Sequence, residues 1–295
     1  MRLSTIVATG GLGLSVAAFL GRLTQPFELL SQFRVQYIVL GLVLFTWSAV
    51  ARERPTAIVA ACMLGLNLGV VAVVASQVAS QVAPASEAAG PRLAWANLYR
   101  KPEVLTTLAS QTKGADIVAL TEVPANGLVR IRAAFPGFQC VLFDDDRGNP
   151  FAVAIVARKA CPSHDEGIDV RYADIDGLRV VAVHARPPWD NARTAARNAA
   201  IRRAFTLASA APRGLLVGDF NATPWSPAFT GKTMAELRRA RCGWPGQPTW
   251  LGSGPVLGLV LDQVFVTPRL GVVHCSIGGD IGSDHRPLSL TLTPQ

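Results

Sequence analysis

The chain has 295 residues, of which 50% are hydrophobic and 16% are charged, and its formal net charge is +8. Soluble domains carry about 25% charged residues, so this composition, with a mean hydropathy of +0.31, excludes a protein that is soluble throughout its length. The apolar content excludes wholesale disorder, and the 26 Gly and 20 Pro show no period, which excludes a collagen-like chain.

Three apolar segments near the N-terminus are long enough to cross a membrane. They cover residues 3–20, 35–50 and 56–75, and none of them contains a charged side chain. A membrane-spanning helix needs about 17–25 mostly apolar residues. We therefore predict a membrane domain at 1–75 that consists of three transmembrane helices.

The first of these segments has an alternative interpretation as a cleaved signal peptide. Arg2 precedes the apolar run, and small residues lie near its end at Ala17 and Ala18. The two further apolar segments that follow directly favour a transmembrane helix instead.

Positively charged residues between the spans predict the orientation in the membrane. Three spans place Arg2, Arg52 and Arg54 on one side of the bilayer and Arg22 and Arg34 on the other. Cytoplasmic loops carry the excess of Lys and Arg, so the group of three is expected inside. The chain is then a multi-pass protein of the cell membrane, and its C-terminal domain lies outside the cytoplasm.

A linker and one larger domain are predicted after the membrane domain. Residues 76–91 are rich in Ala, Ser, Val and Gln, contain no Lys or Arg, and end in Gly90-Pro91. This composition is typical of a linker. Residues 92–295 are sufficient for one domain. The net charge of the chain suits partners that carry phosphate or present an anionic surface, which includes membrane lipid. No protein partner follows from the sequence.

The cysteines leave the redox state open. Cys62 lies in the third span, and Cys140, Cys161, Cys242 and Cys275 lie in the C-terminal domain. Four cysteines allow two disulfides in three different pairings in an oxidising compartment, and free buried thiols are an equal alternative.

Strands and helices alternate in the C-terminal domain. Short apolar runs bounded by turn residues predict strands at 93–98, 116–120, 151–156, 180–183, 215–217, 261–266 and 288–292. Helices are predicted at 103–111, after Pro102, and at 191–210, before Pro212. This alternation indicates an α/β layered domain.

Polar residues that can do chemistry follow or begin several of these strands. Glu122 comes just after one strand, and Asp219 and Asn221 follow another. Asp262 opens a strand, and His285 precedes the last one. Each residue alone is more often a turn former or a structural hydrogen-bonding group. Their repeated position at strand ends is the stronger signal.

Five segments together resemble the endonuclease/exonuclease/phosphatase superfamily. The strongest matches are GDFNATPWS at 218–226 and GSDHRP at 282–287. LTEV at 120–123 is a fair match, although the family often has Gln at position 121, and VHARPP at 183–188 matches a branch with a second active-site histidine. The match at Asn97 is the loosest. The resemblance covers about residue 91 to the C-terminus and implies a four-layer α/β sandwich of the deoxyribonuclease-I-like fold, here preceded by three transmembrane helices.

The resemblance also implies a metal site. It assigns Asn97, Glu122 and Asp284 as metal ligands, and these oxygen donors suit Mg²⁺ or Mn²⁺. A metal at this place would neutralise charge on a substrate phosphate.

Catalytic roles follow from the same resemblance. His285, oriented by Asp262, either accepts a proton from the attacking water or stabilises the transition state as a cation, with Asp219 as the competing candidate for positioning the water. Asn221 is expected to donate hydrogen bonds to a phosphate oxygen, and His184 to bind the phosphate or protonate the leaving group. The acid that orients His184 is not obvious, and the candidates are Asp144, Asp145 and Asp146, for which a solvated acidic turn is the alternative.

Arginines after His184 are candidates for binding the substrate. They are Arg186, Arg193 and Arg197, and the last two lie one helical turn apart. The alternative is an ordinary solvated helix surface in a basic domain.

The sequence thus predicts a membrane-anchored, metal-dependent phosphoesterase. Attachment to the membrane favours a lipid-linked phosphate or pyrophosphate, in a layout similar to small bacterial membrane phosphatases of polyprenyl pyrophosphate recycling. The main alternative is a nuclease that acts on nucleic acid outside the cytoplasm. A catalytically inactive scaffold is the third hypothesis, and the full set of acids, amides and histidines argues against it.

Overall fold

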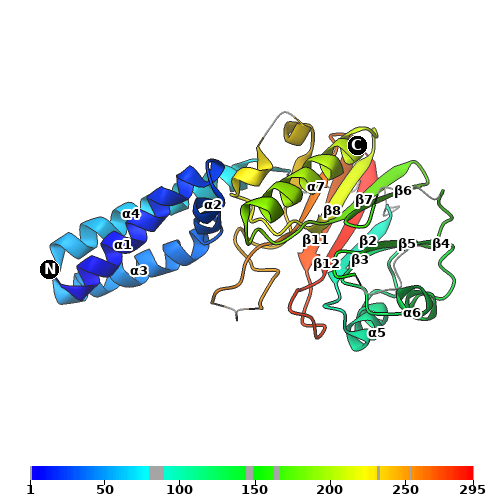
Figure 1. Ribbon diagram of the computed structural model, residues 1–295, viewed down its shortest axis with the longest axis horizontal. Coiled ribbons are helices and arrows are strands. Elements are labelled where there is room, and N and C mark those ends of the chain that lie inside the picture. Colours follow the sequence, from blue (N-terminus) through cyan, green and yellow to red (C-terminus); the bar gives the residue numbers. More distant parts are fainter. Residues whose placement is uncertain are drawn as a thin grey trace.

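Three long helices form an extension at one end of the computed structural model (Figure 1). The model describes residues 2–79, 90–143, 149–162, 167–230, 233–252, 254 and 256–294. The long helices are α1 (Leu3–Ala17, continued by the 3-10 turn Ala18–Arg22), α3 (Arg34–Ala51) and α4 (Arg54–Ser76), and the short helix α2 (Gln25–Ser31) lies between α1 and α3. All three long helices are long and apolar enough to cross a membrane. They agree with the three segments predicted from the sequence.

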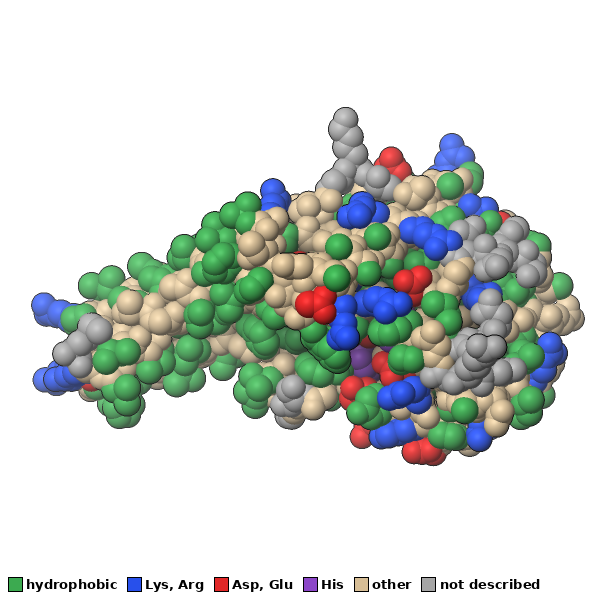
Figure 2. Space-filling view, viewed as in Figure 1, with side chains coloured by type: hydrophobic (Ala, Val, Ile, Leu, Met, Phe, Trp, Pro, Cys, Tyr) green, Lys and Arg blue, Asp and Glu red, His purple; other side chains and the backbone are tan. Residues whose placement is uncertain are grey.

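Hydrophobic side chains cover the outside of this helical bundle (Figure 2). Its interior is small, with Ala8, Tyr37, Ala60 and Met63 at the centre. Gly11 allows the close packing, because a Cβ atom there would lie 2.8 Å from the sulfur of Met63. The exposed outer surface is therefore apolar, as expected for helices surrounded by lipid.

Two six-stranded sheets form the core of the remaining domain. The first, sheet A, has the order β1 (Val78–Ala79), β9 (Arg238–Ala240), β10 (Asp262–Val266), β8 (Gly214–Asp219), β7 (Leu178–His184) and β6 (Val170–Ile175). The second, sheet B, has the order β11 (Leu270–Ile277), β12 (Leu288–Pro294), β2 (Arg92–Asn97), β3 (Ile117–Thr121), β5 (Val153–Ala157) and β4 (Cys140–Leu142). Their facing apolar side chains form one hydrophobic core between the sheets.

Helices cover the outer face of each sheet and complete four layers (Figure 1). On sheet A the helix is α7 (Asn191–Ser209), which begins where the Asp190 carboxylate accepts a hydrogen bond from the Arg193 backbone N–H at 2.7 Å. Its buried Phe205 packs on Phe220 and Phe265. On sheet B the helices are α5 (Pro102–Gln111) and α6 (Gly127–Ala134). The predicted α/β sandwich is confirmed.

The segment predicted to be a linker begins with a strand. Helix α4 ends at Ser76, and Val78 and Ala79 then form β1, which pairs in parallel with Arg239 and Ala240 of β9. The chain that leaves the three long apolar helices is thus hydrogen-bonded to sheet A at once. Residues 80–89 lie outside the described part of the chain.

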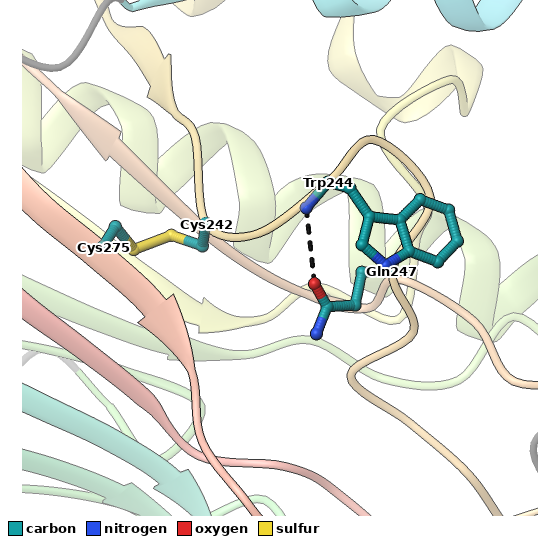
Figure 3. The surroundings of a disulfide bond; sticks show 4 residues. All are labelled: Cys242, Trp244, Gln247 and Cys275. Carbon is teal, nitrogen blue, oxygen red and sulfur yellow. Dashed lines mark hydrogen bonds between the residues drawn. A yellow bond between two sulfur atoms is a disulfide. The ribbon is translucent and has the colours of Figure 1, made fainter.

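Two disulfides cross-link the domain. Cys140 pairs with Cys161, and Cys242 pairs with Cys275, so one of the three pairings that the sequence allows is selected. The second disulfide joins the segment after β9 in sheet A to β11 in sheet B, beside a turn in which Gln247 accepts a hydrogen bond from the Trp244 backbone N–H (Figure 3). Both bonds fit an oxidising compartment.

We expect peptide mapping under non-reducing conditions to recover Cys140–Cys161 and Cys242–Cys275. Because each bond closes a loop of 21 or 33 residues, its removal relaxes the unfolded chain, and a Cys242→Ser/Cys275→Ser variant should lose about 3 kcal/mol of unfolding free energy. Cys62→Ser is the matched control and should leave that free energy unchanged. Recovery of any other pairing, or of four free thiols, would contradict the assignment.

Candidate active site

The metal-ligand candidates of sheet B lie together because β2 and β3 are parallel neighbours. Asn97 at the end of β2 pairs in register with Thr121 at the end of β3, so Glu122 follows immediately beside it. The Asn97 side-chain amide donates to Glu122 Oε1 at 3.0 Å. Asp284 lies in the loop before β12 and accepts a hydrogen bond from Trp250 Nε1 at 3.0 Å.

The strand ends of sheet A bring the other candidates to the same place. His184 at the end of β7 is in register with Asp219 at the end of β8, and Asp219 is in register with Asp262 at the start of β10. Asn97 Nδ2 lies 3.4 Å from Asp219 Oδ2 and so joins the two sheets. The site is therefore built where the ends of the central strands of both sheets meet.

A pocket of about 640 Å³ opens over these strand ends. Its polar wall includes Glu122, His184, Asp219, Asn221, Asp284 and His285. Among the apolar side chains that surround them are Phe151, Trp189 and Leu29, of which Leu29 comes from helix α2. Concave pockets in which polar groups converge beside apolar side chains are the usual form of small-molecule sites.

His285 and Asp262 form a buried charged pair. Their Nδ1 and Oδ2 atoms are 2.7 Å apart, and Trp95 Nε1 donates to the other Asp262 oxygen at 2.7 Å. Burial alone would lower the pKa of His285, but the carboxylates of Asp262 and Asp219 outweigh it and raise this pKa to about 10. His285 is therefore a cation at neutral pH, and this charge in turn holds the pKa of Asp262 below its usual value against the effect of burial.

The pKa of Asp219 is shifted in the opposite direction to that of Asp262. Burial raises its pKa to about 7, even though the nearby His285 charge opposes the shift. Asp219 Oδ2 lies 3.5 Å from His285 Nε2 and 3.5 Å from His184 Nε2, and its Oδ1 accepts a hydrogen bond from the Asn221 backbone N–H at 2.9 Å. A carboxylate with a pKa near neutrality suits general-base chemistry.

His184 is neutral. Burial first, and then the charge of His285, lower its pKa to about 3. Its Nε2 faces Asp219 at 3.5 Å and Glu122 Oε1 at 3.9 Å, and its ring packs on Phe151. The acids proposed to orient it, Asp144, Asp145 and Asp146, lie outside the described residues.

Glu122, Asn97 and Asp284 carry oxygen donors of the kind that a hard divalent cation prefers, and the Asn97 Oδ1 atom accepts a hydrogen bond from the Tyr99 backbone N–H at 3.0 Å. Burial and the neighbouring Asp284 charge raise the pKa of Glu122, so this carboxylate is in an environment that a cation would stabilise. A second group, Asp219, Asp262 and His285, also has ligand atoms within 4.8 Å of one another. Within the second group, Asp262 and His285 already share a hydrogen bond.

Four residues that line the pocket, Tyr99, Arg100, Glu122 and Asn221, adopt a left-handed backbone conformation that is uncommon for residues other than glycine. The φ angle is +50° at Glu122 and +46° at Asn221. Such strain persists where the surroundings determine the conformation, and it is concentrated at functional sites. In Asn221 the side-chain amide donates to the Ala185 carbonyl at 2.8 Å.

The three arginine candidates occupy different environments. Arg186 lies 4.6 Å over the Phe151 ring and Arg193 lies 5.0 Å over the Trp189 ring, and both line the pocket. Arg197 does not line it. It is fully buried and forms an ion pair with Glu28 of helix α2, so the two arginines of α7 do not share one surface.

Sequence reasoning missed several residues of the site. Leu29 and Gln32 line the pocket from the connection between the first two long apolar helices, for which the sequence predicted no role in the site. Trp95 and Trp250, which hold Asp262 and Asp284, carry no sequence signal beyond aromatic character. Their positions depend on long-range contacts.

Comparison with solved structures shows the same fold at low sequence identity. Humanized TDP2 from D. rerio is 16% identical with a TM-score of 0.54, over 69% of this chain and 98% of that one. The 3′ phosphatase NExo from Neisseria, bound to a product DNA hairpin, is 18% identical with a TM-score of 0.52, over 68% and 98%. An endonuclease/exonuclease/phosphatase from Bacteroides vulgatus is 20% identical with a TM-score of 0.52, over 70% and 99%.

Comparison with curated protein sequences gives no match. The model of the Endonuclease/Exonuclease/phosphatase family matches residues 94–285, which span the site from before Asn97 to His285. The chain belongs to the endonuclease/exonuclease/phosphatase family and is a hydrolase of phosphoester bonds.

Proposed function

We propose that this chain is a membrane-anchored, divalent-metal-dependent phosphoesterase that hydrolyses a lipid-linked phosphate or pyrophosphate outside the cytoplasm. The proposal rests on one observation, which is that residues from the connection between two long apolar helices form part of the pocket wall. Leu29 and Gln32 line the pocket, and they lie between two helices that are apolar enough to cross a membrane. A pocket bordered by this connection opens next to the bilayer surface, where a lipid headgroup is concentrated.

The titration behaviour of the site supports a division of catalytic roles. Asp219 accepts the proton of the attacking water, because its pKa of about 7 matches that task. His285, a cation with a pKa of about 10, stabilises negative charge on the phosphoryl oxygens. Neutral His184 and the Asn221 side chain donate hydrogen bonds to the same oxygens, and Asp262 keeps His285 charged and oriented.

Asn97, Glu122 and Asp284 would hold Mg²⁺ or Mn²⁺. When bound, the ion supplies Lewis-acid stabilisation of phosphoryl charge. Arg186 and Arg193 at the edge of the pocket would bind further oxygens of a pyrophosphate or a headgroup.

A nuclease is the second candidate function. The similarity of the fold to NExo, solved with a DNA hairpin, favours it. The apolar pocket lining and the contribution from α2 favour the lipid-linked substrate.

The arrangement of charges along the helical bundle supports an external catalytic domain. Arg2 Nη1 donates to Glu53 Oε1 at 2.8 Å, so Arg2, Arg52 and Arg54 gather at the tip that is far from the α/β domain (Figure 1). The positive-inside rule puts this tip in the cytoplasm. The two disulfides agree with this orientation.

Replacing Asp219 or His285 should remove most of the hydrolytic activity. With Mg²⁺ and detergent-purified protein, we expect Asp219→Asn and His285→Ala to lower phosphate release from a polyprenyl pyrophosphate by about 10²- to 10⁴-fold, because the first removes the proton acceptor and the second removes a positive charge that stabilises the transition state. His274→Ala, at an exposed histidine of β11, is the matched control. Nicking of plasmid DNA by the wild type with an inert lipid would replace this function by the nuclease.

The metal assignment predicts a changed Mg²⁺ requirement. Glu122→Gln removes a charged ligand, so the Mg²⁺ concentration for half-maximal activity should rise by about tenfold or more. Glu103→Gln, at an exposed glutamate of α5, should leave it unchanged. An identical Mg²⁺ titration for Glu122→Gln and the wild type would remove Glu122 from the ligand set.

The orientation can be tested with reporters fused after Gln295. Alkaline phosphatase should be active there, because it folds only outside the cytoplasm, and a fluorescent protein that folds only inside should stay dark. The opposite pair of signals would place the catalytic domain in the cytoplasm and make soluble nucleotide or inositol substrates the better candidates.

A further inference from the structure

Helix α2 packs directly on the catalytic domain through buried polar side chains. Glu28 is 2% exposed and Gln32, at the end of the helix, is 4% exposed. Glu28 Oε1 accepts a hydrogen bond from Nη2 of Arg197, whose side chain is fully buried on α7. The contact joins the segment between two membrane helices to the middle of the α/β domain.

Arg197 extends this link to the active site. Its Nη1 donates to the backbone carbonyl of Asn221 at 3.3 Å, and Asn198 Oδ1 accepts from the rest of the guanidinium at 2.8 and 3.0 Å. Asn221 is the residue with φ of +46° whose N–H binds Asp219 Oδ1. One guanidinium thus connects Glu28 to the strained turn that follows the catalytic carboxylate.

The rest of that turn is also held by α2. Ser226 Oγ donates to Glu28 Oε1 at 2.8 Å, and the Thr223 backbone N–H donates to Gln32 Oε1 at 2.7 Å. Trp225 Nε1 donates to the Gln32 carbonyl at 3.3 Å. Segment 219–226, which we call the catalytic turn, therefore depends on α2 for hydrogen-bond partners at three positions along its length.

Helix α2 also donates a hydrogen bond to a second segment of the pocket wall, residues 187–189. Gln25 Nε2 donates to the Pro188 carbonyl at 2.6 Å, and Pro187, Pro188 and Trp189 line the pocket after His184. Helix α2 therefore touches both segments that border the catalytic groups of sheet A.

The energetics favour a role in positioning over a role in stability. A buried ion pair contributes little to stability compared with apolar packing, because both charges must be dehydrated. Burial disfavours the charged form of Arg197 and lowers its pKa, and Glu28 opposes this effect. What the pair does supply is a fixed geometry, since the planar guanidinium binds the carboxylate and the Asn221 carbonyl at defined angles.

We propose that Glu28 and Arg197 are positioning residues for catalysis, through which the membrane-embedded part of the chain sets the conformation of the catalytic turn. The reaction that they serve is the proposed phosphoester hydrolysis. The full chain is therefore needed for an organised site, although the family match begins only at residue 94.

Full-length Glu28→Gln and Arg197→Gln proteins test the proposal through a split between kcat and KM. We expect kcat to fall by about 10- to 100-fold on both a polyprenyl pyrophosphate and soluble bis(p-nitrophenyl) phosphate, because small displacements of catalytic groups cost this much. KM should change by about twofold or less. Arg202→Gln, at an exposed arginine of α7, is the matched control and should retain wild-type kcat.

The Glu28→Gln/Arg197→Gln double variant separates positioning from charge balance. It carries no unpaired buried charge, so its thermal midpoint should return close to that of the wild type while kcat stays low. Full recovery of kcat together with the midpoint would show that the pair matters only for folding, and would overturn the proposal.

Hydrogen exchange measured by mass spectrometry gives a test that is independent of activity. In Glu28→Gln, the amides of residues 219–226 and 185–190 should exchange faster, while those of β5 at 153–157 should exchange as in the wild type. Unchanged exchange at 219–226 with wild-type kcat would refute the positioning role. A wild type that hydrolyses neither substrate would refute the proposed function instead, and the exchange experiment would still decide about α2.

Discussion

Burial of several ionisable groups between the ends of two sheets is the constraint on which the site depends. Asp219, Asp262 and His285 are each at most 5% exposed, and such groups can stay together only if their charges and hydrogen bonds match. Of the two carboxylates beside His285, Asp262 forms the close pair and has a lowered pKa, whereas burial raises the pKa of Asp219. The pKa values of Asp219 and Asp262 therefore differ because both are buried but only Asp262 forms the close hydrogen bond with His285.

The register of neighbouring strands brings these groups together at the strand ends. Because the groups lie at strand ends, the sequence could predict many of the site residues. The apolar runs of β2, β3, β8 and β10 are almost continuous, as expected for strands buried on both faces, so their ends and the polar residues at those ends were recognisable. The three long apolar helices were equally clear from uninterrupted apolar segments. The motifs around Asp219 and His285 indicated the family, and the resemblance to that family predicted the fold.

Other features could not be predicted because they depend on contacts between distant parts of the chain. Strand β1 is two residues long and exists through pairing with β9, and Trp95 contacts Asp262 across 167 positions of sequence. The environment of Arg197 also depends on a contact with a distant part of the chain. Its spacing from Arg193 predicted a common helix surface, but the approach of α2 buries one of the two and leaves the other exposed.

The position of α2 in the chain has a consequence for biosynthesis. Residues 25–31 leave the ribosome long before the catalytic turn at 219–226. If the three long helices cross the membrane as proposed, both segments must lie on the same side of the bilayer for Glu28 to contact Arg197. In that arrangement, a catalytic domain that stays on the other side of the bilayer from α2 lacks this contact. In the proposed orientation, assembly of the hydrolase is therefore completed only after insertion, which would spare phosphate esters inside the cell from the newly made enzyme.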